Sequence, residues 1–141
     1  MILAIDIDNK ITNFGIFNDN DLIEQFTIRT DKNRSIDEIR LSIKLILLDK
    51  GINLDDIKDI IISTVVPELT SLYDEISQNI TGKKPILISA GVKTGLNIKC
   101  ESPKEVGSDR IIRAVAANNA YNGDLIVISA ASITTICLLY T

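Results

Sequence analysis

The order in which short apolar segments occur is the feature that most constrains the fold of this chain. Three strand-like segments come first, at 2–7, 14–17 and 22–29, and polar turn residues separate the last two, as between consecutive antiparallel strands. Helical patterns then alternate with short apolar runs, and an uncharged segment at 125–141 is typical of two further strands. Because 27 of the 141 residues are isoleucine and only 4% of residues are aromatic, the core has to be aliphatic and favourable to strands.

The helix signals in the middle of the chain complete this pattern. Ser35 and Glu38 have the spacing of a capping box, and a helical apolar stripe follows until Gly51 ends it. Two short buried strands are expected after it, at 60–63 and 85–88, and two further helices, from Pro67 and from Ser108 onward. The apolar residues of the last helix that are expected to face inward are Ile111, Ile112, Val115 and Ala116. Three antiparallel strands followed by alternating helices and strands predict an α/β domain of the ribonuclease H-like type, in which helices flank a mixed sheet.

The charge and residue types exclude several kinds of site. The chain has 15 Lys plus Arg against 19 Asp plus Glu, a net charge of −4, which argues against a strongly basic nucleic-acid binder. It has no histidine, so a His-based triad or metal site is excluded and any general base has to be Asp or Glu. Cys100 and Cys137 lack the paired spacing of a zinc site or a disulfide framework, which favours a reducing cytoplasm.

Neither end of the sequence predicts a membrane or export signal. The N-terminus reaches Asp6 without the basic segment of a signal peptide. The uncharged run 125–141 is interrupted by Ser and Thr and is shorter than the ~20 predominantly apolar residues that a membrane helix needs. We therefore expect a cytoplasmic protein with a buried hairpin in this run and no membrane partner.

The two ends of the chain resemble each other at an offset of 123 residues. Segment 3–9, LAIDIDN, lies over 126–132, IVISAAS, and Thr12 lies over Thr135. A strand, a tight polar turn and a second strand occur at both ends, as if a duplicated domain began again; a chance likeness of two apolar hairpins is the alternative. On the first interpretation, residues 1–122 form a ribonuclease H-like domain and residues 123–141 form the first hairpin of an incomplete second domain.

Asp6 is the first residue with a plausible chemical role. It ends a strand immediately before a polar turn, where a carboxylate can hold Mg²⁺ while backbone N–H groups approach phosphate oxygens. A solvated acidic turn is the alternative. A second glycine-containing segment, GVKTG at 91–95, lacks the spacing of a phosphate-binding P-loop and is better explained as a flexible loop.

The other candidate is the segment GSDR at 107–110, which opens a predicted helix. Gly107 allows close backbone approach, and the free N–H groups and dipole of the helix start favour an anion. From its position alone, Asp109 is better explained by ordinary helix capping. Arg110 suits either a clamp on a carboxylate or phosphate, or an ion pair with Glu105.

Taken together, these segments resemble the type III pantothenate kinases, a family of the actin-like ATPase superfamily. The likeness extends over nearly all 141 residues, and its two most specific blocks are GVKTGL and GSDR. The six matching blocks, in chain order, are 3–7, 14–17, 30–34, 62–67, 91–96 and 107–110.

The resemblance implies a kinase that uses ATP to phosphorylate pantothenate to 4'-phosphopantothenate, the first step of coenzyme A biosynthesis. It also implies Mg²⁺ and a monovalent cation, K⁺ or NH₄⁺, as cofactors, and a homodimer of two-domain chains. Asp109 is the implied catalytic residue and Asp6 the implied Mg²⁺ ligand. The implied ATP- and phosphate-binding residues are Asp6, Ile7, Asp8, Asn9, Lys10, Ile11, Thr12 and Ser132; the implied substrate-binding residues are Cys100, Gly107, Ser108, Asp109 and Arg110.

The chain departs from the family pattern at both phosphate turns. The family's first turn is D-x-G-N-T, but Asp8 replaces the glycine and Lys10 replaces the threonine. The added carboxylate is expected to weaken ATP binding, and Lys10 offsets part of its charge. In the second turn, Ser129 replaces the aspartate that is expected to bind the monovalent cation, and Cys100 stands where the family usually has a tyrosine.

These departures, and a second domain that ends after its first hairpin, predict very slow turnover or none for the 141-residue chain. The alternative is a catalytically inactive binding or regulatory relative, like the members of the family described as accessory factors for transcriptional regulators. A fragment of a longer protein is a third explanation of the same features.

Overall fold

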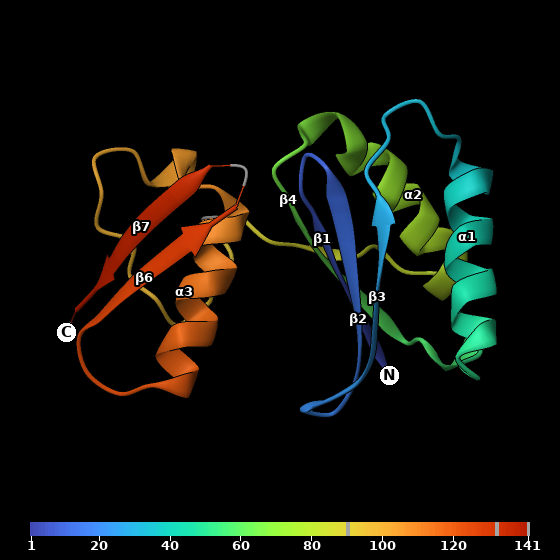
Figure 1. Ribbon diagram of the computed structural model, residues 1–141, viewed down its shortest axis with the longest axis horizontal. Coiled ribbons are helices and arrows are strands. Elements are labelled where there is room, and N and C mark those ends of the chain that lie inside the picture. The colour runs from blue at the N-terminus through green and yellow to red at the C-terminus, as the bar shows by residue number, and fades with distance from the viewer. Residues whose placement is uncertain (90, 132, 141) are drawn as a thin grey trace. The chain divides into compact units, whose positions relative to one another are not determined.

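A computed structural model describes residues 1–89, 91–131 and 133–140 of the chain (Figure 1). The residues form two compact units, Met1–Leu87 and Ile88–Thr141. The predicted phosphate-binding residue Ser132 lies outside the described residues. The division of the chain at residue 122, expected from the sequence, remains a prediction.

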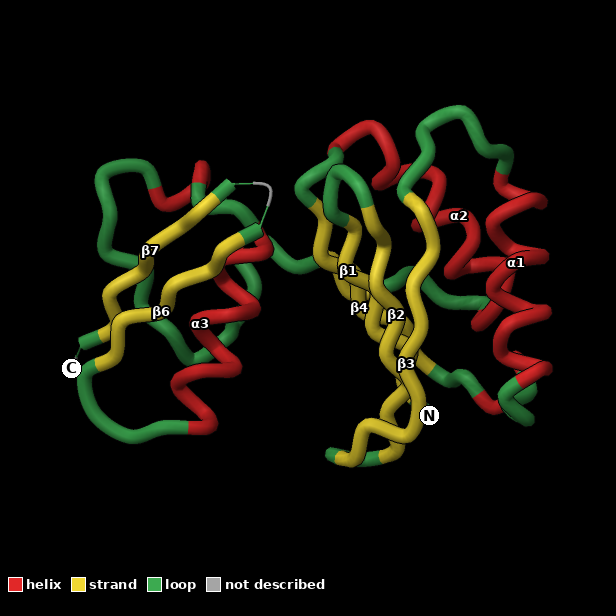
Figure 2. The backbone as a smooth tube through the Cα atoms, viewed as in Figure 1, coloured by secondary structure: helices red, strands yellow, loops and turns green. Residues whose placement is uncertain are grey.

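The first unit is built on a five-stranded mixed sheet (Figure 2). β1 (Ile2–Ile7), β2 (Ile11–Asn18) and β3 (Asp21–Arg29) are consecutive antiparallel strands. β4 (Asp59–Thr64) pairs in parallel with β1, and β5 (Ile86–Leu87) pairs in parallel with β4. The strand order is β3-β2-β1-β4-β5, so the predicted mixed α/β architecture is confirmed.

The helices of the first unit begin and end at the residues that their local signals indicate. α1 (Ile36–Asp49) starts with the predicted capping box: the Ser35 hydroxyl accepts a hydrogen bond from the Glu38 amide at 3.3 Å, and the Glu38 carboxylate accepts one from the Ser35 amide at 2.7 Å. Gly51 follows its end with a φ of 75°, which favours glycine. The remaining helical segments are the short helices η1 (Leu54–Asp56) and η2 (Pro67–Leu69) and the longer α2 (Thr70–Thr81).

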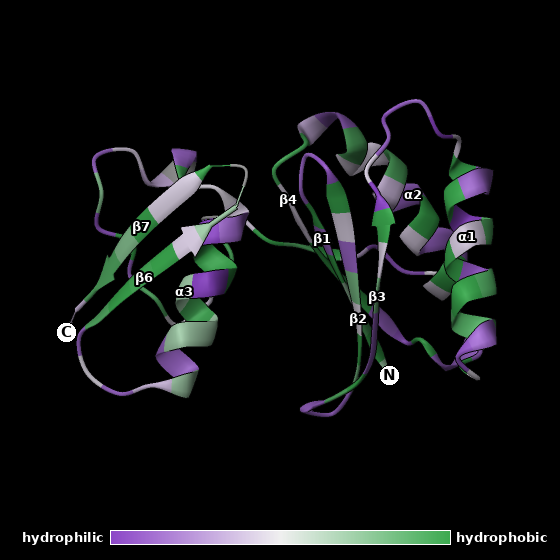
Figure 3. Ribbon diagram, in the orientation of Figure 1, coloured by the Kyte–Doolittle hydropathy of each residue, from purple (hydrophilic) through white to green (hydrophobic). Residues whose placement is uncertain are grey.

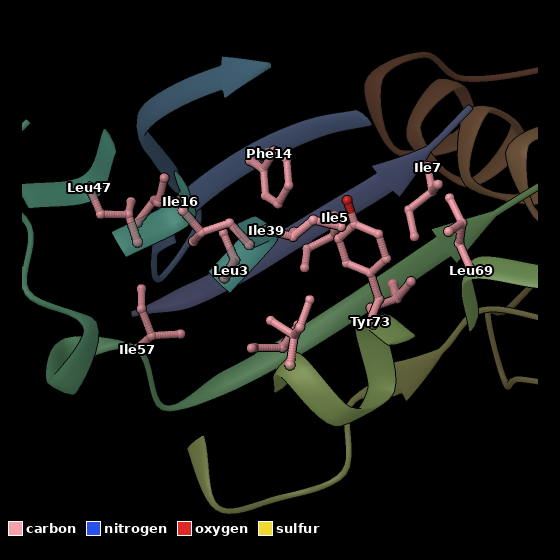
Figure 4. Packing of buried hydrophobic residues seen from close by; sticks show 14 of the residues in the cluster. Leu3, Ile5, Ile7, Phe14, Ile16, Ile39, Leu47, Ile57, Leu69 and Tyr73 are labelled. Atoms are coloured by element: carbon pink, nitrogen blue, oxygen red, sulfur yellow. The ribbon is translucent and has the colours of Figure 1, made fainter. Parts of the chain in front are cut away.

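α1 and α2 lie on the same side of this sheet and cover one of its faces (Figures 1 and 2). Alternate residues of β1 and β2 point into this face, and every third or fourth residue of the helices meets them. The ring of Tyr73 lies among the aliphatic side chains (Figure 4). Five elements contribute to this hydrophobic core: β1, β2, β4, α1 and α2. Their buried hydrophobic residues are Leu3, Ile5, Ile7, Phe14, Ile16, Ile39, Ile43, Leu47, Ile60, Ile62, Tyr73 and Ile76.

The second unit holds one long helix and one hairpin. A loop leads through η3 (Pro103–Glu105) to α3 (Ser108–Ala120), and β6 (Leu125–Ala130) pairs antiparallel with β7 (Thr134–Leu139). The two strands expected in this run do pair, but the hairpin is not buried as expected: Ile126, Ile128 and Ile136 are each at least 65% exposed. Its assignment to a second domain stays a prediction. Among the described residues, no helix has the length and apolar character needed to cross a membrane.

The inward face of α3 differs from the sequence-based expectation. Ile111 is buried as predicted, but the second fully buried residue of the helix body is Ala114, whereas Ala116, also predicted to face inward, is exposed. A stripe at i and i+3 therefore replaces the broader stripe that the apolar pattern indicated.

Candidate functional site

A row of polar side chains crosses the first sheet on the face opposite α1 and α2. Asp6 is in register with Asn13 of β2 and Ser63 of β4, and Asn13 is in register with Thr27 of β3. Residues in register on neighbouring strands share a face, and Ile5 and Ile7 point toward the helices, so Asp6 points the other way. The sequence indicated Asp6 alone, because it does not show which strands become neighbours.

The turn between β1 and β2 has an internal hydrogen-bond network. The Asp8 amide donates to the Ile11 carbonyl at 3.1 Å, and the Asn9 amide donates to Asp8 Oδ1 at 2.7 Å. The Asp8 carboxylate therefore occupies the backbone N–H group of Asn9 within the turn. Asn9 and Lys10 are exposed, and Ile11 is about half exposed.

Two residues of the predicted phosphate site are buried instead of exposed at the turn. Ile7 belongs to the core, so only its backbone faces the strand end, and its carbonyl accepts from the Val65 amide at 3.1 Å. Thr12 is completely buried, and its hydroxyl lies 2.9 Å from that of Thr30. A direct role of the Thr12 hydroxyl toward ATP stays a prediction.

Thr12 also shares a hydrogen bond with Tyr73, which lies on α2. Burial of the Tyr73 phenol raises its pKa above the ordinary value, while the hydrogen bond with Thr12 and the charge of Arg34 act in the opposite direction. The network of three hydroxyl groups thus connects the β1–β2 hairpin, the segment after β3 and α2.

Charged side chains join the loops beside this strand end. Lys32 Nζ lies 2.9 Å from Glu68 Oε1, which links the loop after β3 to η2. The hydrogen bond from Lys32 lowers the pKa of Glu68. Arg34 donates to the Ser42 hydroxyl at 2.6 Å and to the Glu38 carbonyl at 3.1 Å, which fixes the start of α1.

In the second unit, the start of α3 positions Asp109. Arg113, one helical turn later, donates from Nη1 to Asp109 Oδ2 at 2.6 Å. A Cβ atom added at Gly107 would lie only 2.6 Å from Asp109 Oδ1. Gly107 therefore leaves room for the carboxylate of Asp109 over the backbone, and Arg113 holds its other oxygen. Arg113 was not among the residues predicted from the sequence, although its i, i+4 spacing from Asp109 is a usable signal.

The predicted substrate residues Cys100 and Arg110 line one pocket of about 240 Å³. Leu96, from the GVKTGL block, lines the same pocket, so the two most specific blocks of the sequence come together there. Cys137 from β7 and Ile111 from α3 complete the apolar wall. Ser108 is buried at the first position of α3. Among the described residues, no ion pair between Arg110 and Glu105 is present at this end of the helix.

The residues present fit Mg²⁺ only in part. Within the described segments, no three Asp, Glu or Cys side chains come together as a ready-made metal cluster. Mg²⁺ commonly uses one or two protein carboxylates together with phosphate oxygens and water, and Asp6 can serve as that carboxylate. Ser129 is half-buried on β6 opposite Thr135, so a monovalent cation there would meet neutral hydroxyl groups.

Asp6 belongs to the first unit and Asp109 to the second. Their convergence on one pocket, on which the sequence interpretation depends, stays a prediction.

Comparison with known proteins identifies the family. The model of the family described as "Type III pantothenate kinase" matches residues 2–141. A protein of Exiguobacterium sibiricum named "Type III pantothenate kinase" is 36% identical over 137 residues, which is 97% of this chain and 54% of that protein. The chain thus spans about half the length of this curated relative. With a match along almost its whole length, the chain belongs to the type III pantothenate kinase family.

Proposed function

We propose that this chain contributes the N-terminal part of a site that transfers a phosphoryl group from ATP to pantothenate. The observation that carries the proposal is the position of the Asp109 carboxylate. It lies over Gly107, and its Oδ2 is 2.6 Å from Arg113 Nη1. Asp109 lies in the first turn of α3, and the next residue, Arg110, lines the pocket together with Cys100. A carboxylate of fixed orientation next to a pocket lined by the cationic side chains of Lys99 and Arg110 suits a small substrate that carries a hydroxyl and a carboxylate.

The same proposal assigns the chain a ribonuclease H-like, actin-like fold. The strand order β3-β2-β1-β4-β5, with three antiparallel strands before the parallel ones, supports it. The offset of 123 residues supports a second similar domain from residue 123: it moves the bounds of β1 onto those of β6 and the start of β2 onto the start of β7. The family membership supports a homodimer in the cytoplasm.

In the proposed mechanism, Asp109 accepts the proton of the pantothenate hydroxyl as that oxygen attacks the terminal phosphorus of ATP. Arg110 binds the carboxylate of pantothenate, and Arg113 keeps the Asp109 carboxylate oriented. Asp6 would hold Mg²⁺, which supplies neutralisation of phosphate charge when bound. Alignment and charge neutralisation account for most of phosphoryl-transfer catalysis, so a carboxylate base is sufficient. Ser129 would take the place of the carboxylate that holds K⁺ or NH₄⁺.

The test measures ADP release with and without pantothenate. We expect slow release that depends on pantothenate and falls about a hundredfold in Asp109→Asn, the lower end of the usual effect of losing a general base. Glu105→Gln, a neutral replacement of an exposed carboxylate near the same helix start, should leave the rate unchanged. Equal rates in wild type and Asp109→Asn would contradict the proposal, and a stable chain that binds neither ATP nor pantothenate in calorimetry would favour the regulatory alternative.

A further inference from the structure

Both cysteines of the chain line one pocket of the second unit. Cys100 comes from the loop before α3, and Cys137 comes from β7. They line the pocket of about 240 Å³ to which Arg110 also belongs. Their spacing in the sequence does not predict this arrangement, because it depends on how the loop lies against β7. The mechanism proposed above gives neither thiol a chemical step.

The course of the loop brings the two cysteines to the same end of β7. Loop residues 95–100 and residues 137–140 together line two adjoining pockets, of about 240 Å³ and 410 Å³, which share part of their walls. The larger pocket is lined by Gly95 and Tyr140 and by neither cysteine, whereas the smaller one is lined by both cysteines and by neither Gly95 nor Tyr140. The loop therefore runs antiparallel to this end of the strand.

The two thiols differ in their access to solvent. Cys100 is exposed, whereas Cys137 is half-buried on a strand against which α3 packs. Ile111 and Ala114 of α3 line the pocket beside Cys137. A reagent that arrives from solution therefore meets Cys100 first, and Cys137 is placed to react second.

The charge of the pocket selects the kind of reagent. Among the described residues that line the pocket, the charged ones are Lys99 and Arg110. Both belong to the loop or to α3, because no charged residue occurs in β6 or β7 (Figure 3). Two cationic side chains at one pocket raise the local concentration of an anionic reagent.

We propose that Cys100 and Cys137 form a thiol–disulfide exchange site for an anionic disulfide of low molecular weight. The Cys100 thiolate attacks one sulfur of the reagent, so that a mixed disulfide forms on Cys100 and one thiol leaves. The Cys137 thiolate then attacks the Cys100 sulfur, the second thiol leaves, and a disulfide between the two cysteines remains. The cysteines lose two electrons and two protons, and the reagent gains both as two thiols.

The disulfide would tie the loop to β7 across the pocket that contains Arg110. Because the proposed function assigns this pocket to pantothenate, we expect the oxidised chain to lose pantothenate-dependent ADP release; this consequence rests on the proposed function. In a reducing compartment such a bond is transient and regulatory. A metal ion is a weaker candidate for the pair, since no group of three Cys, Asp or Glu side chains occurs among the described residues and a structural zinc site needs four ligands.

The experiment exposes the reduced 141-residue chain to oxidised glutathione, a disulfide that carries carboxylates. Free thiols are trapped at intervals, and intact-protein mass spectrometry with peptide mapping identifies the products. We expect the wild type to reach the internal disulfide and Cys137→Ser to stop at one glutathione on Cys100. Cys100→Ser should react roughly tenfold more slowly, because its remaining thiol is half-buried.

A comparison of two reagents tests the charge selection without a substitution at either cysteine. Relative to the chain unfolded in urea, the folded wild type should react faster with oxidised glutathione than with cystamine, a cationic disulfide. Lys99→Gln should lower this preference about fivefold, the effect of one unit charge at close range in water. Lys93→Gln is the matched control: this lysine of the same loop is exposed and lines neither pocket, so the preference should stay unchanged.

Several results would overturn the proposal. They are glutathione adducts without an internal disulfide, covalently linked dimers as the main product, equal rates for Cys100→Ser and the wild type, and a reagent preference that Lys99→Gln does not change. Mass spectrometry decides the thiol chemistry even if the chain releases no ADP, so failure here is distinguishable from failure of the proposed kinase function. An internally bridged chain that keeps full pantothenate-dependent ADP release would instead contradict the assignment of this pocket to pantothenate.

Discussion

Asp8→Gly should raise the affinity of the chain for ATP while it lowers the stability of the first unit. Asp8 Oδ1 accepts a hydrogen bond from the Asn9 amide at 2.7 Å, so the substitution removes a negative charge and frees an N–H group at the same turn. Among the described residues, Asp19 is the one residue other than glycine with a positive φ. The backbone at Asp8 therefore has no conformational need for glycine.

The size of each effect follows from these contacts. A carboxylate about 5 Å from a phosphate charge in a water-like environment opposes binding by about 1 kcal/mol. An amide that is free to donate to the anion adds about 1 kcal/mol. The sum of about 2 kcal/mol corresponds to a roughly thirtyfold gain in ATP affinity. The same glycine costs about 0.5–1 kcal/mol of folding free energy, because it widens the unfolded ensemble.

Calorimetric titration with MgATP and thermal unfolding measure the two effects separately. Asp8→Asn removes only the charge, so it should gain roughly fivefold in affinity, as expected for about 1 kcal/mol. Asp19→Gly is the matched control in the other hairpin turn: it should leave ATP affinity unchanged and raise the melting temperature, because a φ of 53° favours glycine. Unchanged or weaker ATP binding by Asp8→Gly would refute the reasoning.

Three further predictions concern the two units separately. Gly107→Ala should reduce pantothenate-dependent ADP release about as strongly as removal of the Asp109 carboxylate, with unchanged circular dichroism. The added Cβ would lie only 2.6 Å from Asp109 Oδ1 and would displace that carboxylate. Normal activity would contradict the position described for the Asp109 carboxylate. Tyr73→Phe should lower the free energy of unfolding by about 1 kcal/mol at neutral pH. Because the pKa of Tyr73 is raised in the folded state, the stability that its hydroxyl contributes is complete below the ordinary tyrosine pKa and is lost as the pH rises through the folded-state pKa. The stability of Tyr73→Phe should therefore fall less steeply than that of the wild type in alkaline titrations followed by fluorescence or circular dichroism. Ser35→Ala should cost about 1 kcal/mol in urea unfolding through loss of the N-cap, and an unchanged midpoint would show that the cap is redundant.

Local signals predicted the elements of this fold well because their causes are local. The capping box at Ser35 and the glycine after α1 involve residues within one or two helical turns, so the chain shows them directly. The strands at both ends were visible for the same reason, as short apolar segments next to polar turns. The broader error on α3, where Ala114 and not Ala116 is buried, arose because small residues give a weak apolar pattern.

The arrangement of the candidate site was less predictable, because it depends on which distant segments become neighbours. Asn13 and Ser63 stand beside Asp6 only after β2 and β4 have paired with β1 in a particular register. Burial of Thr12 results from the packing of α2, which the hairpin sequence does not contain. The resemblance to a family indicated which residues form the candidate site. It did not show that the Asp8 carboxylate accepts a hydrogen bond from the Asn9 amide.

The Thr30 side of the first hairpin has a mechanical consequence. The Thr30 amide donates to the Lys10 carbonyl at 2.9 Å, and its hydroxyl meets that of Thr12 at 2.9 Å, so the turn after β1 and the segment after β3 are joined at two points. Lys32 then ties this segment to η2. A displacement of the β1–β2 turn by a bound anion is therefore transmitted to the segment after β3 and to η2, so these three segments are expected to move together.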